Sequence, residues 1–292
     1  MFEEYASFCY DQIGTYSLDY IDYFEDLRPQ LSKANMNVSL PEFVSAMFFS
    51  TGMTFLFVIF VFGTLMALAG GLAGFITSLI LALVLSAGTL LGFYLFPSII
   101  IKQRASKIRD SLPFATMYLS TLAGTGTSLP KLFKVLSEVD EYGEVAEEAG
   151  KISRDIETFN MDTTEALRKA AERTPSEEFK NLMWGMNHTL TSGGSLRSFL
   201  RERSDTLMKD YRRRVEEFSE TLSLLVEMYI TLVIVGSIIF TSMSLVMSTI
   251  QSGGGSGAFI VKIQVISIFI GLPMISGMFI LLVGGLAPGG IR

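Results

Sequence analysis

Four long apolar runs constrain the fold of this chain more than any other feature. They cover residues 47–70, 72–97, 224–247 and 258–286, and the first two contain no charged side chain. A helix needs about 20 apolar residues to cross a bilayer. The sequence therefore predicts an all-α integral membrane protein with four transmembrane helices, in agreement with a hydrophobic content of 49% and a mean hydropathy of +0.43.

Basic residues predict the orientation of these helices. Nineteen of the 23 Lys and Arg residues lie between positions 99 and 222, whereas the connections 70–74 and 248–257 carry no charge. Because Lys and Arg concentrate in cytoplasmic loops, we expect the central segment and both termini to be cytoplasmic in a multi-pass protein of the cell membrane. The acidic, aromatic N-terminus lacks the basic region of a signal peptide, and the sequence leaves open whether it forms an amphipathic helix on the membrane or on the central segment.

The predicted domain organisation has four parts. These are an N-terminal cytoplasmic segment (1–46), a transmembrane hairpin (47–97), a cytoplasmic helical bundle (98–222) and a second transmembrane hairpin (223–292). Within the bundle, helices are expected over 106–124, 128–138 and 144–159, and three more are expected to open at Asp162 with Glu165 as a capping box, at Thr174-Pro175 with Glu177, and at Ser195. No residue breaks the last helix before residue 247, which predicts a rod roughly 80 Å long.

One phrase occurs twice in the bundle. "GTSLPKLF" begins at Gly126 and "GGSLRSFL" begins at Gly193, 67 residues later. In each copy we expect glycine to end one helix and a serine, Ser128 or Ser195, to cap the next. Gly-x-Ser-Leu is also common punctuation between helices, but a duplicated three-helix unit that packs into a six-helix bundle is the favoured interpretation.

At these residues the chain resembles a known family. "LSTLAGTGTSLPKLFKVLSE", "TSGGSLRSFLRERSD" and the "TPSEEF" that follows an "ALRKAAER" helix are similar to the F domain of the type II secretion family. "LSKANMNVSLPEFV" before the first apolar run is most similar to the archaeal members, which serve archaella and adhesion pili. The resemblance covers about residues 30–250, and its motifs are helix turns rather than reactive side chains.

The resemblance implies a platform protein at the base of a type IV filament machine. It implies that a hexameric secretion ATPase docks on the cytoplasmic side and that pilin-like subunits are drawn from the membrane. Many members carry two such domains in tandem, whereas this chain carries one. This departure implies a homodimer, a pairing with a second F-domain chain, or one half of a longer tandem protein.

Composition argues against catalysis. The chain has one cysteine, Cys9, and one histidine, His188, so a metal site or a nucleophilic triad has few possible members. The glycine-rich stretch 251–257 lacks the Lys-Ser/Thr of a phosphate loop. We expect no enzyme activity, no cofactor, no bound metal and no nucleic-acid partner.

Candidate contact residues follow from charge and position. For the ATPase we predict Lys131 and Arg197 in the repeated turns, with Glu144, Glu147 and Glu148 in the acidic middle of the bundle. For the acidic residues, an ordinary solvated face is the favoured interpretation over a contact with a basic protein surface.

Small residues mark the faces on which the membrane helices are expected to pack. Gly88 and Gly92 form a GxxxG motif, and Gly271, Pro273 and Gly277 interrupt the last apolar run. Those faces could meet each other, a second copy or the apolar helix of a pilin.

Two alternatives to a moving platform remain at this point. A small transporter or membrane signalling protein would need polar groups in the membrane, and Glu227 and Lys262 are the candidates. They lie toward opposite sides of the bilayer, which disfavours an ion path between them. A purely structural anchor has the same sequence signature as a platform.

Overall fold

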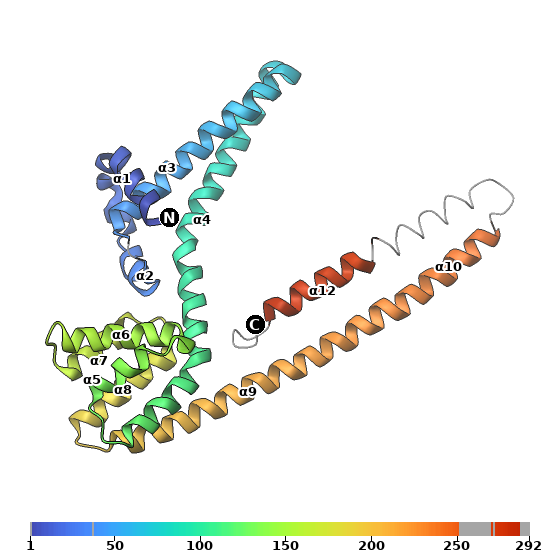
Figure 1. Ribbon diagram of the computed structural model, residues 1–292. Coiled ribbons are helices and arrows are strands. Elements are labelled where there is room, and N and C mark those ends of the chain that lie inside the picture. The colour runs from blue at the N-terminus through green and yellow to red at the C-terminus, as the bar shows by residue number, and fades with distance from the viewer. Residues whose placement is uncertain (1, 37, 251–269, 271, 287–292) are drawn as a thin grey trace. The chain divides into compact units, whose positions relative to one another are not determined.

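The computed structural model describes residues 2–36, 38–250, 270 and 272–286, and all regular elements in these ranges are helical (Figure 1). The α-helices are α1 (Phe2–Ser17), α2 (Leu27–Lys33), α3 (Leu40–Val58), α4 (Thr64–Ala123), α5 (Leu129–Ser137), α6 (Glu144–Glu157), α7 (Thr163–Arg173), α8 (Glu177–Thr191), α9 (Leu196–Ile230), α10 (Gly236–Ile250) and α12 (Leu272–Leu286). Short 3₁₀-helices, η1 (Leu18–Phe24) and η3 (Asp140–Tyr142), and π-helices, η2 (Ile59–Gly63) and η4 (Thr231–Val235), join some of them. Contacts group the chain into two units, Met1–Arg203 and Ser204–Arg292, which divide within α9.

The segment predicted as the first transmembrane hairpin, here called the first hairpin, is built from α3, η2 and the beginning of α4. A capping box starts α3, because the Ser39 hydroxyl accepts the Glu42 backbone N–H and the Glu42 carboxylate accepts the Ser39 backbone N–H. The two helices then lie side by side (Figure 1). Residues 70–74, expected as an open connection, have a helical backbone.

Three described helices are long and apolar enough to cross a membrane. They comprise Leu40–Gly63, Ile76–Ala123 and Leu196–Met243. The fourth predicted span, 258–286, lies partly outside the described residues, and within it Pro273–Gly284 forms a shorter apolar helix. Four spans with cytoplasmic termini therefore remain a prediction. The described helices agree with the prediction of an all-helical membrane protein.

The second apolar run and the first helix of the bundle form one element. α4 continues without interruption from Thr64 to Ala123, across the boundary expected at 97/98, and contains Pro97 and Pro113. The predicted helix 106–124 is the end of this longer helix. A proline has no N–H to donate to the carbonyl four residues earlier, so Pro97 weakens α4 where the apolar run ends.

The bundle consists of α5–α8; α5, α6 and α8 pack against the last part of α4, and α7 packs on α6 and α8 (Figure 1). Its core is apolar and includes Ile108, Leu112, Leu119, Leu132, Phe133, Leu136, Ile152, Leu167, Phe179 and Leu182, all nearly inaccessible to solvent. Two helix starts differ in detail from the prediction. At the start of α7, the Asp162 carboxylate accepts the Thr164 backbone N–H at 2.9 Å, in place of the capping box expected with Glu165. At the start of α8, the capping residue is Ser176 and not Thr174, and the Ser176 hydroxyl accepts the Phe179 N–H.

The N-terminal segment packs on the first hairpin. Ala6 and Cys9 of α1 and Leu27 and Leu31 of α2 are buried with Phe43, Val44 and Met47 of α3 in one apolar cluster. Tyr5 and Phe8 add edge-to-face contacts with Phe49. The acidic, aromatic N-terminus therefore packs over the surface of α3, an arrangement favoured by the apolar area that it buries.

The second unit contains the rest of α9, then η4, α10 and α12. Residues 196–250 are helical throughout, as predicted, although the π-turn η4 interrupts the regular α-helix. Tyr229 of α9 stacks on Phe279 of α12 with ring centroids 4.6 Å apart, and its hydroxyl lies 2.8 Å from the Ser276 hydroxyl.

Candidate functional site

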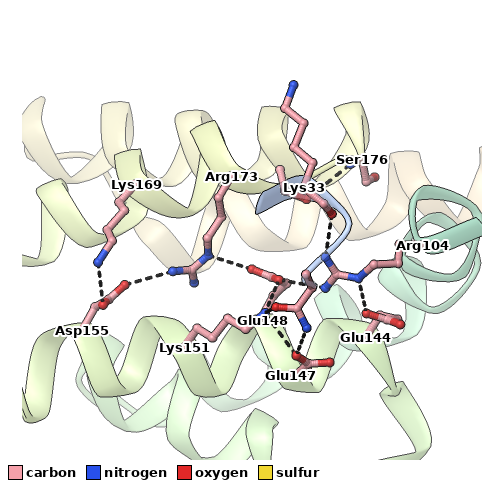
Figure 2. A network of polar contacts seen from close by, with 12 residues as sticks. Lys33, Arg104, Glu144, Glu147, Glu148, Lys151, Asp155, Lys169, Arg173 and Ser176 are labelled. Carbon is pink, nitrogen blue, oxygen red and sulfur yellow. Dashed lines mark hydrogen bonds and ion pairs between the residues drawn. The ribbon is translucent and has the colours of Figure 1, made fainter. Parts of the chain in front are cut away.

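A charged face of α6 is buried inside the first unit, and it forms the most extensive polar network among the described residues (Figure 2). Glu144, Glu148, Lys151 and Asp155 follow one another at steps of three or four along α6, so that they share one side of the helix. The Glu148 side chain is only 1% exposed, and it stands at the centre of the network. Carboxylates are rarely buried to this degree unless cations pair with them.

Arg104 of α4 approaches Glu148 from one side. Its Nη2 donates to Glu148 Oε1 at 3.0 Å and its Nε donates to Glu144 Oε2 at 2.7 Å. Its Nη1 donates at 2.8 Å to the backbone carbonyl of Lys33, the last residue of α2. A single guanidinium thus joins α4, α6 and the N-terminal segment, a role that suits the planar, multidentate donor set of arginine.

Arg173 of α7 approaches Glu148 from the other side. Its Nε donates to Glu148 Oε2 at 2.9 Å and its Nη1 donates to Asp155 Oδ2 at 3.1 Å. Lys169, one turn earlier on α7, donates to Asp155 Oδ1 at 2.9 Å. The network therefore fixes α7 against α6 by charge in addition to the apolar packing beneath.

The charge balance keeps Glu148 ionised. Burial by itself raises the pKa of this carboxyl, but the positive charges of Arg173 and Lys151, together with their hydrogen bonds, outweigh burial and hold the pKa below its ordinary value. An ionised carboxylate only accepts hydrogen bonds. With its oxygens paired to Arg104, Lys151 and Arg173, Glu148 acts as a joint between α4, α6 and α7.

The turn after α2 completes the network. Lys151 Nζ donates to Asn35 Oδ1 at 2.6 Å, and Asn35 Nδ2 donates to Glu147 Oε1 at 2.5 Å. Asn35 has a φ of 54°, a conformation in which asparagine is one of the few favourable side chains. The turn thus presents its amide to α6.

The candidate ATPase-contact residues lie in different environments. Lys131 on α5 and Arg197 at the start of α9 are exposed, and the Glu147 side chain is 48% exposed. Glu144 is mostly covered by its pairing with Arg104, and Glu148 is interior. Burial places Glu148 among the residues that hold the bundle together, because a partner has no access to its side chain.

The two repeated turns share a backbone conformation. Gly126 has a φ of 76° and Gly193 a φ of 71°, both in the left-handed region that glycine occupies without strain. Ser128 and Ser195 precede the next helices, as expected; the Ser195 hydroxyl accepts the Ser198 N–H at 3.3 Å, whereas the Ser128 side chain makes no capping hydrogen bond.

The glycines predicted to pack in the membrane show no close contact in the described residues. A Cβ added at Gly88, Gly92 or Gly277 would meet no heavy atom within 4 Å, Pro273 is exposed, and Gly271 lies outside the described residues. Gly92 instead lines an apolar hollow of about 460 Å³ together with Thr89, Phe93 and Phe96. The helix face that carries Gly88 and Gly92 is accordingly open within the first unit.

Sequence reasoning missed most members of the network. Arg104 is one of the 19 Lys and Arg residues between positions 99 and 222, and the sequence predicts no role for Asn35, Asp155, Lys169 or Arg173. The sequence signal for this network is the charged stripe of α6, in which Glu144, Glu148, Lys151 and Asp155 recur at helical spacing beside an apolar stripe. No group of three or more His, Cys, Asp or Glu side chains in the described ranges could hold a metal ion, and His188 lies exposed at the end of α8.

Comparison with known proteins finds a family match that includes the bundle. Residues 115–243 match the family model described as type II secretion system (T2SS), protein F. An uncharacterized protein of Methanocaldococcus jannaschii is 26% identical over 201 residues, which are 66% of this chain and 33% of that protein. Flagella accessory protein J of the same organism is 30% identical over 176 residues (55% and 31%), and that of Methanococcus voltae is 31% identical over 155 residues (52% and 27%). The matches thus span only about a third of the length of these relatives, and no solved structure matches significantly.

Proposed function

We propose that this chain, whose residues 115–243 belong to the protein F family of type II secretion systems, is the membrane platform of a type IV filament machine of the archaellum or pilus kind. The observation that carries the proposal is the combination of this domain with three helices long and apolar enough to span a membrane. Relatives named flagella accessory protein J support the filament side of the assignment. A structural platform, rather than an enzyme, is what the family and the relatives indicate.

In its mechanism, the platform couples a cytoplasmic hexameric secretion ATPase to the insertion or extraction of pilin-like subunits. α4 and α9 support this idea, because each joins the bundle and an apolar segment within one helix. A displacement of the bundle by the ATPase would then reach the membrane without an intervening loop. The apolar hollow beside Gly92 is the face that we assign to an apolar helix of a subunit or of a second copy.

Charge reversal tests the assigned ATPase contacts. Lys131→Glu and Arg197→Glu change exposed side chains in the repeated turns, so they should weaken capture of the ATPase by the full chain while the bundle stays folded. Lys180→Glu, at an exposed ion pair on α8, is the matched control. Unchanged capture by both variants would remove these residues from the contact.

A deletion in the host tests the platform role itself. Cells without the chain should lose one class of surface filament, as scored by electron microscopy, and retain its subunits in the membrane, and re-expression should restore the filaments. The competing transporter or signalling role would gain support if filaments were unaffected and the purified chain alone moved a solute across proteoliposomes.

A further inference from the structure

α4 contains a weak point directly before the bundle. Pro97 is buried inside the helix and cannot donate a hydrogen bond to the Phe93 carbonyl. Prolines are a common cause of kinks in long helices. Without other support, the bundle could swing about this position relative to the first hairpin.

The N-terminal segment contacts α4 on both sides of Pro97. Before the proline, Leu27 and Leu31 of α2 belong to the apolar cluster of α3, against which Leu90 and Phe93 of α4 pack. The Phe43 and Phe93 rings lie 6.4 Å apart in the same region. α2 is thus anchored by apolar contacts to the hairpin.

Beyond the proline, the ties are polar. The Ser98 hydroxyl donates to Gln30 Oε1 at 3.2 Å, and Arg104 Nη1 donates to the Lys33 carbonyl. Asn35 then reaches α6 through Glu147 and Lys151. Figure 2 shows Lys33 directly above the Arg104 guanidinium, which also holds Glu144 and Glu148.

We propose that α2 and the turn that follows it form a brace across the Pro97 hinge, with an apolar end fixed to the first hairpin and a polar end fastened to Arg104 and α6. Hydrogen bonds at the polar end can be replaced by hydrogen bonds to water, whereas the apolar contacts at the other end have no such substitute. The polar end is therefore the releasable one. The brace sets the angle between the bundle and the first hairpin whether or not the chain serves a filament machine.

Spin-label distance measurements on the full chain in detergent test the brace. In a Cys9→Ala background, labels at Leu83→Cys, exposed on α4 well before the hinge, and at Arg154→Cys, exposed on α6, report the angle. The release variant Gln30→Ala/Asn35→Gly removes the side-chain ties, and glycine retains the left-handed turn at position 35. We expect its distance distribution to be at least twofold wider than that of the parent.

The matched control is Gln103→Ala/Asn160→Gly. Gln103 is an exposed residue of α4, and Asn160 is an exposed asparagine with a φ of 50° in the α6–α7 connection, so this variant repeats the chemistry away from the brace. Its distribution should match the parent. Equal widths for the release variant and the control would overturn the proposal.

Pro97→Ala separates a hinge from general loosening. Added to the release variant, it restores the hydrogen bond to the Phe93 carbonyl and should narrow the distribution again. A distribution that stays wide would refute a hinge at Pro97. Broadening confined to samples whose bundle melts at a lower temperature, as followed by the fluorescence of Trp184 on α8, would equally refute the brace, because unfolding would then explain it.

Discussion

Glu148→Gln should destabilise the bundle more than any other conservative substitution of an acidic residue on α6. The side chain is 1% exposed and contacts three cations, Arg104, Lys151 and Arg173. Removal of one partner from a buried ion pair costs about 3–5 kcal/mol. Here each cation keeps another acceptor, at Glu144, Glu147 or Asp155, so we expect the lower end, about 3 kcal/mol.

The assay is thermal unfolding of the full chain in detergent, followed by fluorescence. Trp184 is the only tryptophan of the chain and lies on α8, so its emission reports on the bundle. A loss of about 3 kcal/mol lowers the Tm by about 6–12 °C for a unit of this size. Glu157→Gln is the control, because Glu157 lies on the same helix in an exposed pair with Lys134, where the expected loss is about 1 kcal/mol or less. Equal shifts for the two variants would refute the central role of Glu148.

Three further predictions concern pH and two kinds of glycine. The pKa of Glu148 is lowered in the folded state, so its contribution to stability is present above the ordinary value of 4.5 and is lost as pH falls below it. The Tm should therefore fall less on acidification in Glu148→Gln than in the parent. Parallel curves of Tm against pH for the two proteins would contradict this. Gly185→Ala places a Cβ 2.3 Å from the Phe199 ring and should lower the stability of the bundle by about 1–3 kcal/mol, as measured by Trp184 melting. Gly185→Ala/Phe199→Ala removes this clash and should recover stability relative to Gly185→Ala. The control Gly150→Ala meets only an ordinary contact at 3.4 Å and should be neutral or stabilising. Gly126→Val and Gly193→Val should each cost about 1–2 kcal/mol because φ is positive, and Gly→Asn should cost less, as Asn35 and Asn160 already adopt that region; indistinguishable melting of the Val and Asn variants would contradict the conformational cause.

The sequence predicted the helical class and the bundle helices well because their signals are local. Apolar length predicted the long apolar helices, three of which in the described residues are long enough to span a membrane. The repeated Gly-x-Ser-Leu phrase located two turns that share left-handed glycines at 126 and 193. α6 was expected over 144–159 and extends over Glu144–Glu157. Each of these features depends on residues within one or two helical turns of each other.

The polar network and the brace were not predictable in the same way. Arg104 contacts Lys33, 71 residues earlier, and Glu148, 44 residues later, so its role depends on how distant segments meet. In sequence it is one of several basic residues beside an apolar run, for which the positive-inside pattern offers a sufficient explanation. The continuity of α4 was missed for a related reason, because Pro97 at the end of an apolar run predicts a boundary as readily as a buried weak point in one helix.

The most direct test of the platform role is the mass of the full chain in detergent, measured by light scattering alone and with the candidate secretion ATPase. We expect a dimer of this chain, or its pair with a second F-domain chain, that captures one ATPase hexamer, with capture reduced in Lys131→Glu and Arg197→Glu. A well-folded chain that leaves the ATPase unbound, alone and together with any second F-domain chain of the host, would contradict coupling between the two.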